Sequence, residues 1–221
     1  MNALFEQKAT SNEDLLQDLV ESLKYSGAIV LGEQSGFFTP DEWDTLNRLG
    51  LQSEMPFETV HIGDAGEPNL VKVGRLMTDV DRPRLVNDKL SKPMLDILCS
   101  PDRMDYFSQL AGGDELFIRR AQINKMHAGS FIGRHVDQDS NPDYGISIVL
   151  QFGQSFTGGD FVIHLPDGKR TAVSPSYRSV TITRCDYAHE VQTVLTGTRT
   201  SLVYFVSHNS GENRRQTKVP S

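Results

Sequence analysis

Apolar and polar residues follow two different patterns along the chain, and the change comes near Leu116. Before it, apolar residues in several stretches recur every three or four positions, as on one face of an amphipathic helix. This pattern, with the residues that flank each stretch, predicts four helices, at 12–24, 40–50, 88–99 and 101–110. Residues 28–31 read as a short strand, and the Gly- and acid-rich stretch 52–75 as turns and short strands. The first half should therefore be helical with minor strands.

The second helix has the clearest start signal. Thr39 is a favourable N-cap, Pro40 suits the first helical position, and acidic residues follow in the first turn. The helix should begin at Pro40 and end near Gly50.

After Leu116 the chain consists of short strand-like segments divided by turn residues. The predicted strands are 117–126, 146–152, 160–165, 179–183, 189–194 and 200–206. The predicted turns are 141–143, 157–159, 166–168 and 195–197. Many short strands with regular turn signals are typical of a β-sandwich or barrel.

The length of 221 residues suits one domain, 1–221. We expect a helical and mixed support region at 1–115, a β core at 116–208 and a flexible tail at 209–221.

Composition narrows the possible partners and the compartment. The net charge of −7 disfavours general attraction to nucleic acid or anionic membranes. Two cysteines, Cys99 and Cys185, form no disulfide framework, which suits a reducing compartment. No secretory signal and no apolar run long enough to cross a bilayer is visible. These features predict a soluble, cytoplasmic protein with no nucleic-acid or membrane partner.

One tripeptide, His135-Val136-Asp137, carries the main candidate chemistry. On a strand, residues two apart share a face, so this imidazole and carboxylate should lie side by side. His189, on a separate predicted strand, would complete a 2-His-1-carboxylate triad, which binds non-haem Fe(II) and leaves coordination positions open. A single histidine is more often an ordinary core or surface residue, but here spacing and strand context favour a metal site.

The other histidines lack a partner pattern, and we interpret them as ordinary structural residues. They are His61, His127, His164 and His208.

A second pair, Arg199 and Ser201, also shares one strand face. Arg199 would point into the interior, where an unpaired charge is costly and needs an anion. A guanidinium holds a carboxylate with a rigid two-pronged fork, and a serine hydroxyl can add a hydrogen bond. The alternative is pairing with an Asp or Glu of the chain itself.

The pattern of His135 and Asp137, then His189, then Arg199 and Ser201, in this order along the chain, resembles that of the 2-oxoglutarate/Fe(II)-dependent oxygenases. The resemblance is greatest to the prolyl-4-hydroxylase-like branch. The likeness covers about residues 117–206 and includes Gly158-Gly159-Asp160-Phe161. It implies a mainly β fold, the double-stranded β-helix or jelly roll (cupin-like), buttressed by the N-terminal helices. It also implies Fe(II), 2-oxoglutarate as cosubstrate and O₂, with ascorbate as the reductant in vitro.

The resemblance assigns roles to single residues. His135, Asp137 and His189 would be the iron ligands and catalytic residues, and Arg199 with Ser201 would hold the distal carboxylate of 2-oxoglutarate. Related enzymes often have a polar residue at the position of Asn124 that contacts the cosubstrate.

Where the family commonly has a tyrosine that binds 2-oxoglutarate, this chain has Met126. Arg120, Gln122 or Tyr144 could compensate. Ordinary strand packing is the alternative interpretation of Asn124 and Met126.

The implied activity is oxidative decarboxylation of 2-oxoglutarate to succinate, coupled to hydroxylation of an unactivated C–H bond. We expect a small-molecule substrate, either a free amino acid or a natural-product intermediate. Hydroxylation of a prolyl or other protein residue is the alternative within the family. A zinc hydrolase and a non-catalytic metal-binding jelly roll are the alternatives from other classes.

Two further features bear on the reaction. Related halogenases have Gly or Ala at the carboxylate position, so Asp137 favours hydroxylation or another oxidation. The polar loop over residues 134–144 should overhang the metal, either as a substrate gate or as an ordinary solvated loop.

Overall fold

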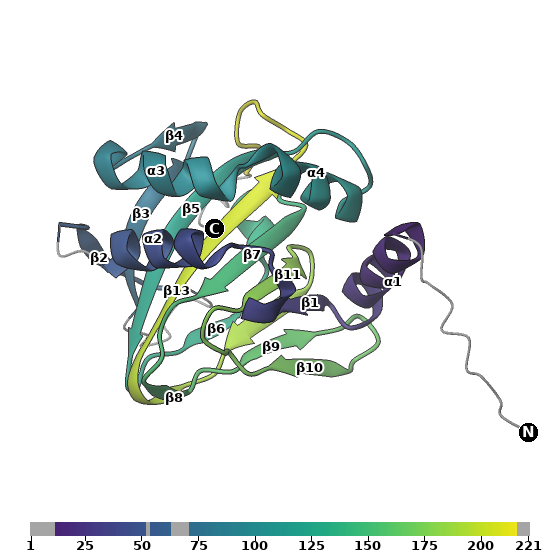
Figure 1. Ribbon diagram of the computed structural model, residues 1–221. Coiled ribbons are helices and arrows are strands. Elements are labelled where there is room, and N and C mark those ends of the chain that lie inside the picture. The colour runs from purple at the N-terminus through teal and green to yellow at the C-terminus, as the bar shows by residue number, and fades with distance from the viewer. Residues whose placement is uncertain (1–11, 52–53, 63–70, 216–221) are drawn as a thin grey trace, which may run out of the picture.

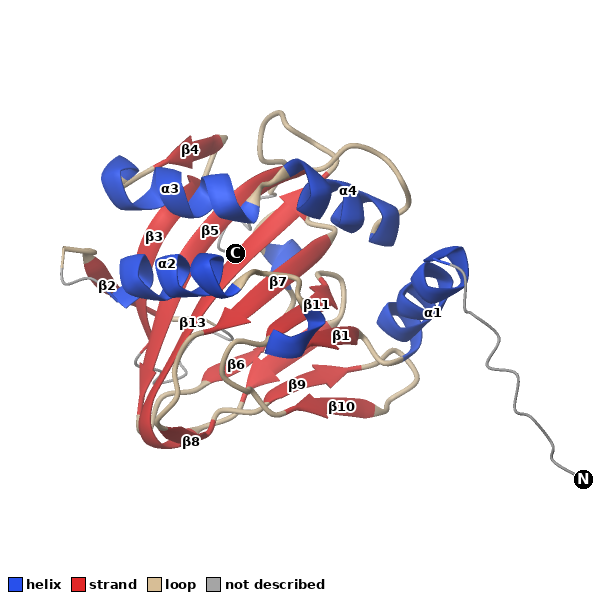
Figure 2. Ribbon diagram, in the orientation of Figure 1, coloured by secondary structure: helices blue, strands red, loops and turns tan. Residues whose placement is uncertain are grey.

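The computed structural model describes residues 12–51, 54–62 and 71–215. In these residues a large curved sheet faces a smaller one, and helices cover the outer face of the large sheet (Figure 1). Among the described residues, the elements from β5 (Phe117–His127) onward are strands apart from one 3₁₀ turn, and Figure 2 shows the strands in red. The fold is therefore the predicted jelly roll with helical support.

Within the described residues the large sheet has the order β1-β11-β7-β13-β5-β3-β2, with β4 beside β3 and β8 beside β13. Its strands are β1 (Ala28–Leu31), β2 (Phe57–Val60), β3 (Val71–Asp79), β4 (Pro83–Leu85), β5 (Phe117–His127), β7 (Ile146–Gln151), β8 (Phe156–Gly158), β11 (Val180–Arg184) and β13 (Val194–Ser207). The small sheet has the order β10-β9-β12-β6. Its strands are β6 (Ile132–His135), β9 (Phe161–His164), β10 (Arg170–Val173) and β12 (Ala188–Val191).

All pairs in both sheets are antiparallel, as a jelly roll requires. The helices are α1 (Asn12–Tyr25), α2 (Pro40–Leu51), α3 (Asp88–Leu98) and α4 (Pro101–Leu110), with short 3₁₀ turns η1 (Glu33–Ser35) and η2 (Asp137–Asp139). Each of the four helices agrees with its prediction to within one residue at either end.

The two faces of β13 have opposite characters. Leu202, Tyr204 and Val206 are fully buried in the core between the large sheet and the helices. Arg199 and Ser201 alternate with them and line a cavity on the other side. This is the predicted period-two alternation. The helices thus form one wall of the main core, and the inner faces of the sheets are left to form a site.

Strand β3 is longer and more central than the sequence indicated. It runs over Val71–Asp79 between β2 and β5, whereas turns and short strands were predicted for 52–75. Gly74 and Arg75 interrupt its apolar pattern, so pairing on both edges, rather than local preference, defines the strand. Residues 52–53 and 63–70 lie outside the described part of the chain.

The predicted turn at 195–197 is wrong, because β13 continues through it. Gly197 has a φ of 73°, and a Cβ there would lie 1.9 Å from the Ser155 carbonyl oxygen. The glycine is thus needed for an irregularity where β13 pairs with β8, rather than for a chain reversal.

The first part of the predicted flexible tail packs against the β core. Asn213 donates a hydrogen bond to the Asp79 carbonyl (2.8 Å), and Arg214 pairs with Asp143 (Nε to Oδ2 2.7 Å). Residues 216–221 lie outside the described residues.

The buried pair Arg119–Asp79 supports this packing. The Arg119 guanidinium contacts the Asp79 carboxylate at 2.9 and 3.2 Å, and it donates to the carbonyls of Asn209 and Gly211. These acceptors satisfy a buried charge that would otherwise be costly, and they explain why residues 209–215 lie along the core.

None of the helices in the described ranges is long and apolar enough to cross a membrane.

The start of α2 is a capping box, which the Thr39 signal predicted in part. The Glu42 N–H donates to the Thr39 hydroxyl (3.2 Å), and the Thr39 N–H donates to the Glu42 carboxylate (2.9 Å). We expect Thr39→Ala to lower the free energy of unfolding by about 1 kcal/mol, because the Glu42 N–H at the start of the helix loses its acceptor. Urea denaturation would measure this, and Thr39→Ser, which keeps the hydroxyl, should have almost no effect. Equal losses in both variants would contradict the capping role.

Candidate active site

Two histidines lie directly opposite each other on neighbouring strands of the small sheet. His189 of β12 is the register partner of His135, the last residue of β6. Opposite residues in an antiparallel pair point to the same face, and the two ring centroids are 4.4 Å apart. Two imidazoles 54 positions apart in sequence therefore meet inside the fold.

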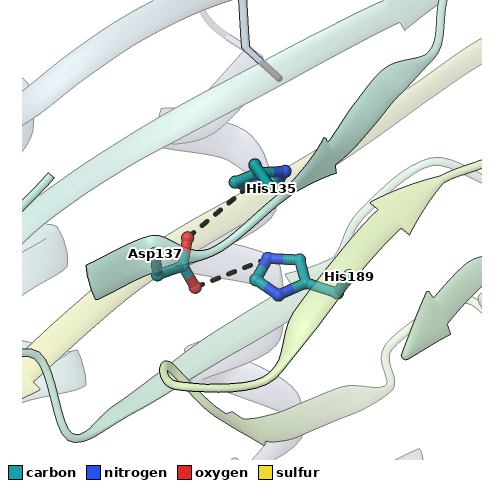
Figure 3. Close-up of side chains that lie close together, drawn as sticks. All are labelled: His135, Asp137 and His189. Atoms are coloured by element: carbon teal, nitrogen blue, oxygen red, sulfur yellow. Dashed lines mark ion pairs between the residues drawn. The ribbon is translucent and has the colours of Figure 1, made fainter. Parts of the chain in front are cut away.

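Asp137 completes the group, although not from the strand that was predicted. Strand β6 ends at His135, Val136 is still extended, and Asp137 opens the 3₁₀ turn η2. The carboxylate nevertheless faces both rings, with Oδ1 3.6 Å from His135 Nε2 and Oδ2 3.5 Å from His189 Nε2 (Figure 3). One ligand atom from each residue lies within 4.8 Å of the others. A single metal ion fits such a group.

Backbone carbonyls orient both rings. His135 Nδ1 lies 2.8 Å from the Gly133 carbonyl oxygen, and His189 Nδ1 lies 2.9 Å from that of Tyr187. A carbonyl only accepts, so each Nδ1 carries the proton and donates it. The Nε2 lone pairs therefore face the aspartate, which is the arrangement that outer hydrogen bonds give to metal-ligating histidines.

The three groups perturb each other's proton affinities. Burial would raise the pKa of Asp137, but His189 and His135, when they are protonated beside its carboxylate, lower it well below its usual value. Burial lowers the pKa of His189, yet the Asp137 carboxylate raises it above the ordinary value. Such a site attracts positive charge, and a divalent cation competes there with protons.

The triad opens into a cavity of about 1010 Å³ between the two sheets. That volume lies at the upper end of the ~300–1,000 Å³ typical of ligand pockets. Phe161, Ile132 and Val191 form apolar wall near the triad, and polar residues of β5 and β13 form the opposite wall. The cavity has room for more than one small ligand.

Arg199 lies in this cavity, 4% exposed. Its Nη1 contacts only the Ser201 hydroxyl (3.3 Å) and the Met126 sulfur (3.7 Å), and its Nε has no partner. Burial lowers its pKa to about 10, against the attraction of Asp160, so the guanidinium stays charged at neutral pH. No acidic side chain of the described residues forms an ion pair with it, contrary to the alternative of an internal partner. A buried cation of this kind calls for an anionic ligand.

The residues proposed with Arg199 lie around it. Asn124 on β5 is the register partner of Ser201, lines the cavity, and accepts a hydrogen bond from the Gln122 amide (2.9 Å). Met126 pairs with Arg199 across the strands and is fully buried. Met126 stands at the sequence position where the resemblance led us to expect a tyrosine.

Of the three residues considered as substitutes for that tyrosine, Arg120 and Gln122 line the cavity. Tyr144 does not; its ring stacks on Phe205, with centroids 4.9 Å apart.

Several residues that line the cavity were not identified as site residues from the sequence. His61, interpreted as structural, lies on the cavity wall just after β2, and Arg214 and Arg215 line it from the C-terminal segment. Their spacing from the triad in sequence carries no signal, because tertiary packing alone brings them there. The loop after the ligand pair does reach the cavity, through Asp139 and Ser140 among others.

Gly159 makes the space that Arg199 occupies. A Cβ at this glycine would lie 2.9 Å from Arg199 Cδ, and its φ is 73°. We expect Gly159→Ala to displace the guanidinium and raise the KM for 2-oxoglutarate by about tenfold, since overpacking costs about 1–3 kcal/mol. Steady-state kinetics at varied 2-oxoglutarate would measure this.

Gly168 is the matched control, because its φ is also positive (84°) but nothing lies within 4 Å of its Cβ position. Gly168→Ala should lose stability without a change in that KM. Equal shifts in KM for both variants would show that backbone strain, and not the position of Arg199, is responsible.

The fold and the site together define a jelly-roll protein with a site for one metal ion. Residues 121–207 match the model of the 2OG-Fe(II) oxygenase superfamily. A solved oxidoreductase of the 2OG-Fe(II) oxygenase family from Burkholderia pseudomallei is 40% identical, with a TM-score of 0.84, and covers 91% of this chain and 94% of its own. A search of curated proteins gave no match.

More distant structures share the fold. A Trichoplax adhaerens prolyl hydroxylase, solved with a peptide fragment of the hypoxia inducible factor oxygen degradation domain, is 13% identical with a TM-score of 0.66 and coverage of 89% and 90%. A Pseudomonas putida prolyl-4-hydroxylase is 17% identical with a TM-score of 0.58 and coverage of 88% and 99%. These likenesses show that the chain shares its fold with prolyl hydroxylases.

The chain therefore belongs to the 2OG-Fe(II) oxygenase family, which confirms the resemblance seen in the sequence. It is a 2-oxoglutarate-dependent Fe(II) oxygenase that uses Fe(II), 2-oxoglutarate and O₂. The zinc hydrolase and the non-catalytic metal-binding jelly roll, which were the alternatives from other classes, do not agree with membership of this family.

Proposed function

We propose that this protein hydroxylates an unactivated C–H bond of a small molecule and converts 2-oxoglutarate to succinate and CO₂. His135, Asp137 and His189 hold the iron. Arg199, Ser201 and Asn124 hold the cosubstrate. The observation that carries the proposal is one cavity that contains both a three-ligand group within 4.8 Å and a buried guanidinium with no acidic partner among the described residues.

The donor set suits Fe(II). Two neutral imidazole nitrogens and one carboxylate on one side of an ion form a facial triad, which leaves the remaining positions for other ligands. Bound iron, with O₂ and 2-oxoglutarate, supplies the oxidising power. The protein contributes position and shelter: the Nδ1 hydrogen bonds fix the rings, and Phe161 and Val191 keep water from the reacting centre.

The cosubstrate fits the polar wall opposite the triad. A carboxylate of 2-oxoglutarate would accept two hydrogen bonds from the Arg199 fork and one from the Ser201 hydroxyl. Asn124, opposite Ser201 in the strand register, adds a polar group beside it. The volume left in a cavity of about 1010 Å³ provides room for a substrate next to the iron.

The carboxylate at position 137 favours oxygen transfer. In related halogenases this position is Gly or Ala, which leaves room for a halide; Asp137 fills it. Hydroxylation is therefore the proposed outcome.

A small substrate suits the enclosing residues. Arg214, Arg215 and the loop residue Asp139 line the cavity together with residues of the sheets, so the cavity is bordered by several parts of the chain. A peptide substrate is the alternative, because a structure with this fold was solved with a peptide.

The test is succinate formation from 2-oxoglutarate with Fe(II), ascorbate and O₂, across amino acids and natural-product intermediates. We expect at least one compound to stimulate succinate formation and to gain one oxygen atom in its mass spectrum. Stimulation by proline-containing peptides alone would favour the protein hydroxylase. No succinate under any condition would contradict the proposed function.

A further inference from the structure

A second arginine of the cavity, Arg120, is not among the residues proposed above to hold the metal or the cosubstrate. It lies on β5, two residues before Gln122 and four before Asn124, and all three side chains line the cavity. Its Nε donates to the Gln122 side-chain oxygen (3.0 Å), and Gln122 in turn donates to Asn124 (2.9 Å). The guanidinium is therefore held on the cavity wall through its Nε.

The four arginines of the cavity differ in their partners. Arg214 pairs with Asp143, and Arg215 is exposed. Arg199 serves the proposed cosubstrate. Arg120 is half-buried, and within the described ranges no acidic side chain forms an ion pair with it; its neutral neighbours are Gln122 and the Tyr144 hydroxyl. A partly buried cation facing a cavity without a counter-charge is arranged to receive an anion.

The strand register separates Arg120 from Arg199. Across β5 and β13, Arg199 is opposite Met126, whereas Arg120 is opposite Phe205. Six positions along a strand correspond to roughly 20 Å at ~3.3 Å per residue. The two arginines therefore stand at different positions along the cavity wall.

Arg120 lines the same cavity as the three metal ligands. An anion bound to Arg120 would therefore share that cavity with the iron.

We propose that Arg120 binds the carboxylate of the substrate, and that the enzyme therefore acts on small carboxylic acids. The inference rests on the proposed function and narrows its substrate class. The planar fork accepts a carboxylate in two parallel hydrogen bonds and fixes its direction. Gln122 positions the fork, and it connects this subsite through Asn124 to the cosubstrate wall.

The test compares each acid with its own primary amide. Succinate formation is measured with Fe(II) and 2-oxoglutarate across amino acids, N-acetyl amino acids and simple 2-hydroxy acids, each as the acid and as the amide. We expect stimulation by an acid and a kcat/KM about 100-fold lower for its amide, because the amide lacks the charge that Arg120 binds.

Arg120→Gln should lower kcat/KM for that acid by about 100-fold and bring the acid-to-amide ratio close to one. A variant that merely damaged the fold would lower both rates and keep the ratio. Arg120→Lys, which keeps the charge but not the fork, should restore part of the preference. Arg170→Gln, an exposed arginine of β10 that does not line the cavity, is the charge-matched control and should behave as the unaltered protein.

Three results would overturn the inference. One is an amide that works as well as its acid. Another is an Arg120→Gln variant whose main defect is a raised KM for 2-oxoglutarate, which would place Arg120 with the cosubstrate. The third is slow conversion of 2-oxoglutarate that no acid accelerates. This result would contradict the assignment of carboxylic acids as substrates but not the proposed oxygenase activity. Absence of any succinate would overturn both proposals.

Discussion

His189→Ala is expected to abolish succinate formation from 2-oxoglutarate. His189 Nε2 is one of three donor atoms within 4.8 Å, and it lies 3.5 Å from the Asp137 carboxylate. Loss of a hydrogen-bonding partner behind a metal ligand already costs about 10–100-fold in affinity or activity, so loss of the ligand itself should cost more than about 100-fold. The measurement is succinate formation together with Fe(II) content after anaerobic loading.

His164→Ala is the matched control for this variant. His164 lies on the adjacent strand β9, opposite Ala188, and contacts Glu190 instead of the triad. It should retain iron and activity. Retained turnover in His189→Ala, with a normal circular dichroism spectrum, would contradict the assignment of the ligands.

The second large effect is expected for Arg199→Ala, in the affinity for 2-oxoglutarate. The guanidinium is 4% exposed and has no acidic partner among the described residues, so a cosubstrate carboxylate would be its counter-charge. Removing one member of a buried charge pair costs about 2–5 kcal/mol, or roughly 30- to 4,000-fold in binding. The measurement is the KM for 2-oxoglutarate, with a smaller change in kcat at saturation.

Arg199→Lys separates charge from geometry in that experiment. Lysine keeps the charge but loses the fork, so its KM should lie between those of the unaltered protein and Arg199→Ala. Binding of Fe(II) should be the same in all three proteins, because Arg199 is not a proposed ligand. An unchanged KM in Arg199→Ala would remove the cosubstrate assignment.

The sequence was informative wherever local pattern controls the structure. The alternation on β13 placed Arg199 and Ser201 on one face and Leu202 and Tyr204 on the other, as observed. The capping residues at Thr39 located the start of α2. Both signals depend on neighbours within a few positions.

The sequence was less informative where contacts between residues far apart in the chain determine the structure. Strand β3 depends on pairing along both edges, and Gly197 permits a continued strand instead of the predicted turn. Likewise, no spacing rule brings His61 or Arg120 to the cavity. From the sequence, Arg120 was considered only as a substitute for a missing tyrosine. Its position relative to Arg199 depends on the strand register, which the sequence alone does not show.

The most direct test of the central claim is a crystal structure of the protein loaded anaerobically with Fe(II) and 2-oxoglutarate, with anomalous diffraction at the iron edge. We expect a single iron peak bound by His135 Nε2, His189 Nε2 and an Asp137 oxygen, with a 2-oxoglutarate carboxylate on the Arg199 guanidinium. An iron peak away from these three atoms, or a cosubstrate that does not contact Arg199, would contradict the account.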